Sequence, residues 1–206
     1  TTMYHGIIDY EPTELVITAR AGTRLADLEA ALDQHGQMLA FEPPYFGAVA
    51  TLGGCVATGL SGPRRATAGA VRDFVLGIRL LNGKCEDLSF GGQVMKNVAG
   101  YDVSRLMVGA MGTLGVLLEV SLKVLPKPSV EITLRMQLDE AAAIEKMNQW
   151  AGKPLPISAT CYVVGELFLS LSCAESAVRA AQVKLGGEEL VEVGVFWKSV
   201  REQRHD

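Results

Sequence analysis

A run of twelve small or apolar residues, Thr51 to Gly62, constrains this chain more than any other segment. The run contains four glycines, carries no charge and has no side chain larger than leucine. Such glycines let backbone N–H groups approach a ligand without obstruction. Thr51 is a suitable N-cap for a short helix over residues 52–60, and a helix N-terminus attracts phosphate. The segment therefore predicts a phosphate-binding backbone or, as the plainer alternative, a glycine-rich surface loop.

The composition excludes several classes of protein. With 49% hydrophobic and 20% charged residues, the chain can bury a core and is not typical of disorder. A net charge of -4 without a basic tract argues against nucleic-acid binding. Glycines and Glu119 interrupt the apolar stretch 105–120, so no segment reaches the ~20 residues of a membrane span. Four cysteines without metal-ligand spacing and three dispersed histidines predict reduced thiols and no metal site.

The first half of the chain predicts strands separated by short helices. A strand over 15–21 leads into a helix capped by Thr23 and closed at Gly36. Asn82-Gly83 predicts a hairpin, because both positions tolerate positive φ. The remaining elements are an apolar helix stripe (Leu25, Leu28, Ala31, Leu32), an extended piece (37–41), the hairpin arms (74–81 and 84–90), a helix started by Asp102 or Ser104 (102–109) and a strand (116–125).

Pro126-Lys127-Pro128 is the best domain boundary in the sequence. Beyond it the pattern changes to strand, helix, two strands around Gly165, helix and strand. This β-α-β-β-α-β order is that of a ferredoxin-like layer. The expected elements are strands over 130–137, 157–163, 167–171 and 190–196, a helix from Asp139 or Glu140 to Trp150, and a helix over 175–185.

Two glycine clusters, Thr51–Gly62 and Gly109–Gly115, lie roughly fifty residues apart. The spacings of a Rossmann fingerprint, a P-loop and a nucleophile elbow are all missing from the sequence. We therefore expect separate segments to hold one large ligand through backbone groups, and a cofactor that contains pyrophosphate fits this pattern.

Several segments carry a family resemblance. The segments Thr51–Gly54, Ala57–Gly59, Arg72–Gly77, Lys96–Asp102 and Gly112–Val116, the last followed by Glu119, resemble the FAD-binding domain of the vanillyl-alcohol oxidase, or PCMH-type, flavoprotein superfamily. Within it, Glu11–Thr18, Ser61–Arg65 and Pro154–Ser158 are similar to the E-type subunits of bacterial glycolate oxidases (glycolate dehydrogenases). The resemblance covers nearly the whole chain.

The resemblance implies an α+β fold. Residues 1–126 would form the second lobe of a PCMH-type FAD-binding domain, a mixed sheet with flanking helices, with the first lobe missing. Residues 127–206 would form a partial ferredoxin-like cap. We expect the upstream pyrophosphate loop and the later cap strands to lie outside these 206 residues, and this fragment alone to be inactive.

The implied cofactor is non-covalent FAD. The 51–62 segment would follow its pyrophosphate towards the isoalloxazine ring, and Val116 would offer backbone groups to the adenine. Cys55, the one candidate for a covalent flavin link, is expected to be a packed helix residue. The resemblance assigns no catalytic residue and no metal ligand. The residues expected to contact FAD are Pro44, Thr51, Leu52, Gly53, Gly54, Ala57, Thr58, Gly59, Ser61, Gly62, Gly115 and Val116.

The implied activity is oxidation of glycolate, a 2-hydroxy acid, to glyoxylate by hydride transfer to the flavin. The partners would be a second flavin subunit and an iron–sulfur subunit. We expect a cytoplasmic protein, with peripheral attachment to the inner membrane through the complex as an alternative. Two other functions stay open: an assembly subunit with a vestigial FAD site, and a related FAD oxidoreductase acting on D-lactate.

Some charged residues keep more than one interpretation. Arg64 and Arg65 would face FAD phosphates, a partner or solvent. Lys96 would lie near the flavin ring or be solvated. Asp73 is expected to anchor the start of the hairpin, and Glu119 to face outwards or touch the rim of the site.

Three aromatic residues are expected to pack. Tyr101 is interpreted as a packing residue and not as a catalytic one. Trp150 and Trp197 are expected in the cap core or at an interface.

Overall fold

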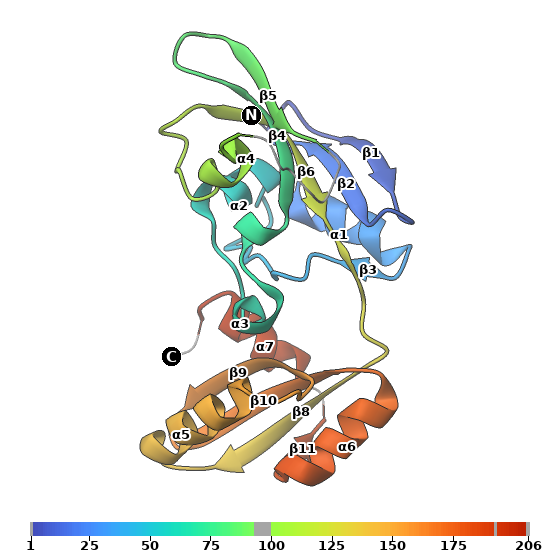
Figure 1. Cartoon of the computed structure of the whole chain (residues 1–206), viewed down its shortest axis with the longest axis vertical. Helices are drawn as coiled ribbons and strands as arrows, with labels where there is room; N and C mark the ends of the chain where they lie inside the picture. The colour runs from blue at the N-terminus through green and yellow to red at the C-terminus, as the bar shows by residue number, and fades with distance from the viewer. Residues whose placement is uncertain (1, 93–99, 192, 205–206) are drawn as a thin grey trace. The chain divides into compact units, whose positions relative to one another are not determined.

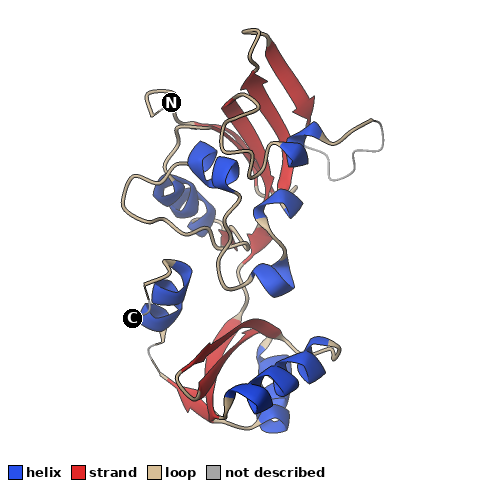
Figure 2. Ribbon diagram, turned by 90° about the vertical axis from the view of Figure 1, so that its left-hand side faces the viewer, coloured by secondary structure: helices blue, strands red, loops and turns tan. Residues whose placement is uncertain are grey.

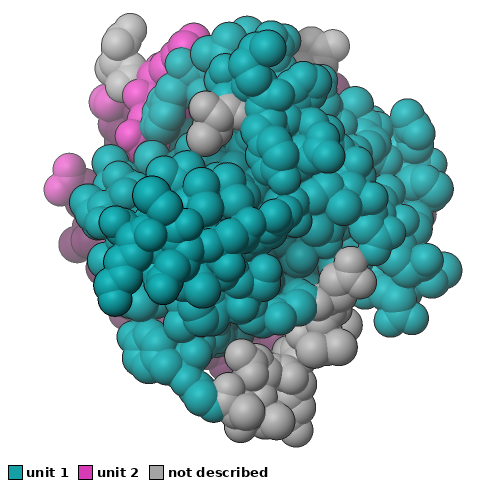
Figure 3. Space-filling view, turned by 90° about the horizontal axis from the view of Figure 1, so that it is seen from above, with its two compact units in different colours: residues 1–62, 69–127 teal, residues 63–68, 128–206 magenta. Residues whose placement is uncertain are grey.

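The computed structural model describes residues 2–92, 100–191 and 193–204 (Figure 1). The chain divides into two compact units, coloured separately in Figure 3. The first unit comprises residues 1–62 and 69–127, and the second comprises residues 63–68 and 128–206. The short segment 63–68, which the domain prediction places in the first domain, thus groups with the second unit. Both units combine helices and strands, which confirms the α+β class.

The first unit is built on a five-stranded sheet in the order β1-β2-β6-β4-β5. The resemblance implies a mixed sheet, but all four pairings are antiparallel. The β1–β2 and β4–β5 pairs are antiparallel because each is a hairpin of consecutive strands, and β6 lies antiparallel to both of its neighbours, β2 and β4. The strands are β1 (Ile7–Glu11), β2 (Val16–Arg20), β4 (Val75–Leu81), β5 (Asp87–Gly91) and β6 (Val116–Lys123). A separate two-stranded sheet joins β3 (Gln37–Met38) to β7 (Leu125–Pro126).

Short helices accompany this sheet. α2 packs against β2 and β6, and α4 against β4 and β5 (Figure 1). Asp102 caps α4, where its Oδ1 accepts from Arg105 N at 3.0 Å, so the prediction of Asp102 as a cap is confirmed. The helices are α1 (Leu25–Asp33), α2 (Leu52–Thr58), the 3-10 helix η1 (Val71–Asp73) and α4 (Val103–Leu106).

Helix α1 buries the expected leucines, Leu25, Leu28 and Leu32, but it does not use the expected cap. The N-cap position is Arg24, which makes no side-chain cap bond, so the assignment of Thr23 is wrong. The Thr23 hydroxyl instead accepts from Gly6 N at 2.8 Å and donates to Gly6 O at 3.1 Å. Thr23 lies one residue before the N-cap position, and its buried hydroxyl holds the N-terminal segment at Gly6 instead of capping α1.

The β4–β5 hairpin is present, but its turn differs from the expected two-residue type. Cys85, not Gly83, takes the left-handed conformation, with φ 59°. Asn82 Oδ1 accepts from Lys84 N at 2.8 Å and from Glu86 N at 3.0 Å. The asparagine side chain thus organises a longer loop by replacing backbone acceptors.

The second unit has the strand order β11-β8-β10-β9, and its elements follow the predicted β-α-β-β-α-β sequence. Figure 2 shows α5 and α6 on one face of this sheet. Their apolar sides meet Ile132, Leu134, Leu167, Leu169 and Leu171 in one core. The elements are β8 (Val130–Gln137), α5 (Glu140–Ala151), β9 (Ile157–Val163), β10 (Glu166–Cys173), α6 (Glu175–Leu185), β11 (Glu188–Leu190) and α7 (Gly194–Arg201), with α3 (Arg65–Ala68) from the inserted segment.

The strand expected over 190–196 is wrong. β11 ends at Leu190, and helix α7 begins at Gly194. Val191 and Val195, which belong to the alternating pattern that predicts a strand, are 87% and 80% exposed. The helix is stabilised instead by its aromatic residues: Phe196 stacks on Phe168 with centroids 4.2 Å apart, and Trp197 Nε1 donates to Thr133 Oγ1 at 2.8 Å. Docking on the sheet has overridden the local pattern.

Candidate functional site

Helix α2 forms as the sequence predicts. Thr51 is its N-cap, and the Thr51 Oγ1 accepts from Gly54 N at 3.2 Å. Gly59 closes the helix in the left-handed conformation, with φ 66°. A left-handed C-cap favours glycine because a Cβ would crowd the backbone. Residues 51–59 of the glycine-rich run therefore form a short helix with defined ends, and residues 60–62 follow it without regular secondary structure.

The amides of the first turn of α2 are all used within the chain. Leu52 N donates to Thr23 O at 2.8 Å, and Gly53 N donates to Ala21 O at 2.7 Å. Gly54 N bonds to the Thr51 side chain, and Cys55 N donates to Thr51 O at 2.9 Å. A helix normally leaves the first three of these donors unsatisfied, whereas the Cys55 N bond is the first bond of the helix itself. The first-turn amides of α2 therefore already have partners within the chain, and the binding of phosphate at this N-terminus stays a prediction.

The two adjacent glycines, Gly53 and Gly54, have different surroundings. A methyl group on Gly53 would lie 2.7 Å from Ala21 Cβ and 2.9 Å from Ala21 O. Gly53 thus lets α2 press against the end of β2. A methyl group on Gly54 would approach only Thr51 Oγ1, at 3.2 Å, and Gly54 is exposed. Of the two, Gly54 is the one that offers backbone to a ligand.

One face of α2 is buried and the other is small and uncharged. Leu52, Cys55 and Val56 are buried, and burial raises the pKa of the Cys55 thiol to about 12. This supports Cys55 as a packed residue, since a reactive cysteine needs an accessible thiolate. On the outer face lie Gly54 and Thr58, and the Thr58 hydroxyl donates to Gly54 O at 2.9 Å. The outer face therefore presents mainly backbone.

The structure brings the second glycine cluster to the C-terminal end of α2. Gly109 N donates to Val56 O at 3.0 Å, and Met111 N donates to Ala57 O at 2.9 Å. A methyl group on Gly59 would lie 3.1 Å from Gly109 Cα. Two segments that are far apart in sequence thus meet at one end of a helix, and glycine at position 59 allows the close approach.

The remaining expected FAD residues have mostly internal roles in this structure. A methyl group on Gly115 would lie 2.7 Å from Leu81 O, so Gly115 allows β6 to approach β4. Val116 pairs with Leu81 and is 48% exposed. Three others meet the chain itself: Pro44 is buried, Ser61 Oγ accepts from Val71 N at 3.1 Å, and Gly62 N donates to Phe41 O at 2.9 Å.

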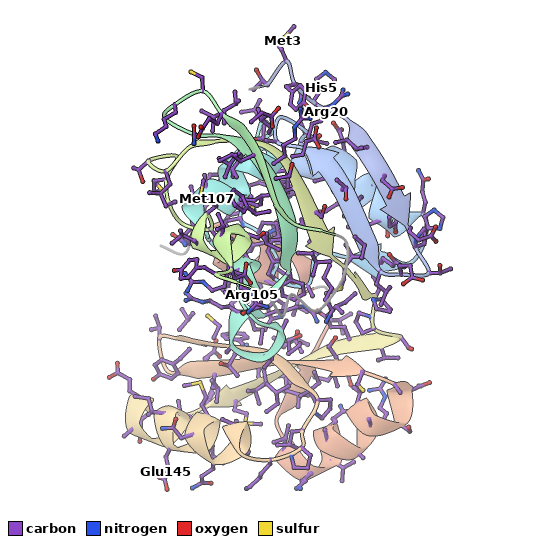
Figure 4. All side chains as sticks on the ribbon, turned by 45° about the horizontal axis from the view of Figure 1, so that its top comes forward. Met3, His5, Arg20, Arg105, Met107 and Glu145 are labelled. Atoms are coloured by element: carbon purple, nitrogen blue, oxygen red, sulfur yellow. The ribbon has the colours of Figure 1, made fainter. Side chains whose placement is uncertain are left out.

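A hollow of about 270 Å³ lies at the start of α2, and no motif in the sequence predicts it. The backbones of Arg24 and Thr51 pair in an isolated bridge and bring the beginnings of α1 and α2 together. Three separate segments form the wall, residues 2–5, 22–27 and 49–51, which explains why no local pattern marks it. The lining residues are Thr2, His5, Gly22, Arg24, Asp27, Val49 and Thr51. Figure 4 labels His5 beside Arg20, whose guanidinium donates to His5 O at 3.2 Å.

Glu119 belongs to a charged network on the sheet. Its carboxylate accepts from Tyr4 and from Arg79, each at 2.7 Å. Arg79 also forms a bidentate pair with Asp87, at 2.9 and 2.7 Å. The Arg79 hydrogen bond lowers the pKa of Asp87, and the hydrogen bond to Glu119 raises the pKa of Tyr4. The network links three strands and gives Glu119 a structural role.

Other expectations have mixed outcomes. Asp73 Oδ2 accepts from Ala70 N at 2.9 Å, which confirms it as the anchor before the hairpin. Trp150 is buried in the second core, as expected. Tyr101 is 75% exposed, so its interpretation as a packing residue is wrong: the short α4 that follows leaves its ring in solvent. Arg64 pairs with Glu131, whereas Lys96 lies outside the described residues.

The described residues also bear on metals and membranes. In ranges 2–92, 100–191 and 193–204, no group of three or more His, Cys, Asp or Glu residues could hold a metal ion. Within the same ranges, no helix has both the length and the apolar character that crossing a membrane requires.

The chain is similar in sequence to known FAD-binding proteins. A model described as FAD binding domain matches residues 1–91. The chain is 54% identical over 201 residues to glycolate oxidase subunit GlcE of Escherichia coli K12, covering 98% of this chain and 57% of the relative. It is 32% identical over 152 residues to glycolate oxidase subunit GlcD of Bacillus subtilis 168, covering 73% of this chain and 32% of the relative.

A solved structure shows the same fold. An alkyldihydroxyacetonephosphate synthase superposes with a TM-score of 0.75 at 15% identity, covering 98% of this chain and 46% of the synthase. The chain belongs to the FAD-binding, PCMH-type class of flavoprotein domains. Within that class it fits the GlcE subunits of glycolate oxidase, and the same findings support FAD as its cofactor. It spans just over half of the length of the Escherichia coli relative.

Proposed function

We propose that the chain is part of the FAD-binding subunit of a glycolate oxidase or dehydrogenase complex, which oxidises glycolate to glyoxylate. The observation that carries this proposal is the convergence of both glycine clusters on α2, whose outer face is uncharged and rich in exposed backbone. The likeness to a glycolate oxidase subunit over 98% of the chain supports the choice of substrate.

The two parts of the chain have separate proposed roles. Residues 1–126 would contribute the second lobe of the FAD-binding domain, and residues 127–206 part of a ferredoxin-like cap over the substrate. The antiparallel five-stranded sheet and the four-stranded sheet support this division. Segment 63–68 is the exception, because it groups with the second unit.

The residues of α2 fit a flat cofactor in part. The exposed backbone at Gly54 and Thr58 can lie against FAD without a side chain in the way, whereas the first-turn amides have no capacity left for its phosphates. We therefore propose that phosphate contacts come from elsewhere and that α2 supplies a surface. When bound, FAD supplies the hydride acceptor, and the protein contributes binding and orientation.

The proposed partners are a second flavin subunit and an iron–sulfur subunit, which would carry electrons onward. Both curated relatives are named as subunits of glycolate oxidase, which supports a multi-subunit assembly. The proposed location is the cytoplasm, with attachment to the inner membrane through the complex as an alternative.

A spectroscopic experiment tests the proposal. The full-length protein would be co-purified with its partners and its flavin absorbance followed at about 450 nm on addition of glycolate. Bleaching by glycolate is the expected result. Bleaching by D-lactate alone would assign a different substrate, and a colourless protein that still assembles would indicate a structural subunit.

A further inference from the structure

The segment Pro63–Ala68, called the strap below, leaves the first unit directly after the glycine-rich run and returns to it at Gly69. The residues on either side of the strap are hydrogen-bonded within the first unit. Gly62 N donates to Phe41 O at 2.9 Å, and Val71 N donates to Ser61 Oγ at 3.1 Å. The six residues of the strap itself belong to the second unit.

Arg64 is the main attachment of the strap. Its guanidinium forms an ion pair with Glu131 on β8 and donates to Ser172 Oγ on β10 at 3.2 Å. The Arg64 side chain is 12% exposed and that of Glu131 is 40% exposed, so the guanidinium is shielded from solvent while the carboxylate is partly screened. A guanidinium held by a carboxylate and a hydroxyl has a restricted orientation.

A network of hydroxyl groups supports Glu131 from the sheet. Ser172 Oγ donates to Glu131 Oε2 at 3.3 Å, and Ser170 Oγ donates to Glu131 Oε1 at 3.4 Å. Ser158 Oγ contacts Ser170 Oγ at 2.8 Å, and Ser158 O accepts from Thr67 Oγ1 of the strap at 2.6 Å. The network includes two residues of the strap, Arg64 and Thr67, so it holds the strap at two points. Hydrogen bonds linked in this way favour one orientation of the side chains involved.

These contacts decide among the interpretations of Arg64. The guanidinium is committed to Glu131 and Ser172. Glu131 balances its charge, which makes it a poor donor for a cofactor phosphate. Arg64 lies two residues after Gly62 and three after Ser61, so a restraint on Arg64 acts on the end of the glycine-rich run through a very short length of chain.

We propose that Arg64 is a positioning residue: by clamping the strap to Glu131, the second unit restrains the C-terminal end of the segment that lies against FAD. This inference rests on the proposed function, in which the run Thr51–Gly62 contacts the cofactor. The second unit thus contributes to the flavin site through the chain itself, and loosening the clamp weakens FAD binding.

The experiment uses two readouts on the full-length protein: hydrogen exchange of peptides covering residues 52–71, and the Kd for FAD. Arg64→Met removes the charge and keeps the aliphatic stem, and Glu131→Gln removes the partner charge and keeps the shape. Arg179→Met is the matched control, because Arg179 forms an ion pair with Glu189 elsewhere in the same unit. Arg64→Lys retains the charge and should fall between the wild type and Arg64→Met.

In Arg64→Met and Glu131→Gln we expect about threefold faster exchange at 52–71 and an FAD Kd about fivefold higher. The double variant should lose no more than either single variant, because both changes break one ion pair. Arg179→Met should match the wild type. A fall in thermal stability with unchanged exchange and unchanged Kd would overturn the proposal by showing a purely structural pair.

The two proposals fail differently. If the wild type binds no FAD, the proposed function is wrong, and the exchange measurement still decides whether the clamp restrains the run. If the wild type binds FAD and Glu131→Gln binds it equally well with equal exchange, the clamp is wrong and the function stands.

Discussion

Gly59 and Gly109 lie in direct backbone contact, so close that a methyl group on Gly59 would be 3.1 Å from Gly109 Cα. Gly59 ends the helix α2, and Gly109 starts the second glycine cluster, whose amides bond to the last carbonyls of that helix. This contact joins the two glycine-rich segments of the proposed flavin surface. Disturbing it should therefore lower the free energy of unfolding of the first unit.

Gly59→Ala should destabilise the first unit by about 2–3 kcal/mol, because a left-handed alanine costs about 1–2 kcal/mol and the methyl group also meets the Gly109 backbone. Gly36→Ala is the control: Gly36 has φ 62°, but a methyl group there meets nothing within 4 Å. Urea denaturation measures both. Equal losses for the two variants would show that the Gly59–Gly109 contact contributes nothing.

Gly53→Ala and Gly54→Ala should have opposite effects although the residues are neighbours. At Gly53 the methyl group overlaps Ala21, and overpacking of this kind costs about 1–3 kcal/mol. At Gly54 the methyl group would meet only Thr51 Oγ1, at 3.2 Å, which has to shift by a few tenths of an ångström. Alanine in a helix is favoured over glycine by about 0.5–1 kcal/mol. Thermal unfolding of the pair distinguishes them, and a destabilised Gly54→Ala would contradict the assignment of its face.

Gly54→Glu should abolish flavin binding and leave the fold intact. The glutamate would project from the exposed face of α2, where it would block the approach of FAD sterically and add negative charge beside an anionic cofactor. Ala26→Glu adds the same charge at an exposed position of a different helix, α1. The measurement is the ratio of flavin to protein after purification, with circular dichroism to check folding. A normal flavin content in Gly54→Glu would show that FAD does not contact this face of α2.

Cys55 should make the first unit less stable in alkali. The pKa of its thiol is raised from an ordinary value of 9.0 to about 12, mainly by burial and to a smaller extent by the charge of Glu29. A group whose pKa is higher in the folded state stabilises the fold fully below its unfolded pKa and loses that contribution as the pH rises. We therefore expect the free energy of unfolding to fall between pH 9 and pH 12.

Cys55→Ala should flatten this pH dependence, whereas Cys85→Ala, at an exposed thiol, should leave it unchanged. Urea titrations at several pH values provide the test. An equal slope in Cys55→Ala and the wild type would mean that other groups cause the loss.

Elements with strong local signals can be predicted from the sequence. Thr51 and Asp139 each precede a helix and cap it through their own side chains. Gly165 lies in the turn of the β9–β10 hairpin with φ 83°. Capping and turn chemistry depend on a few neighbouring residues, so a single sequence contains the information.

The predictions fail where distant residues decide the outcome. Thr23 is predicted to cap α1, but Gly6 occupies its hydroxyl. The valines after Leu190 predict a strand, but Phe168 and Thr133 dock a helix there. Contacts of this kind join segments far apart in the chain, and no local pattern records them.

The candidate site divides in the same way. Residues 51–59 are predictable as a capped, glycine-rich helix, because the glycines, the cap and the lack of charge are local properties of the chain. Three other features come from packing between segments. Gly53 is packed against Ala21 while Gly54 is exposed. Gly109 bonds to the end of α2, and Arg64 forms an ion pair with Glu131. Each of these roles depends on an atom contributed by another segment, and the position of that segment is set by the packing of the whole unit.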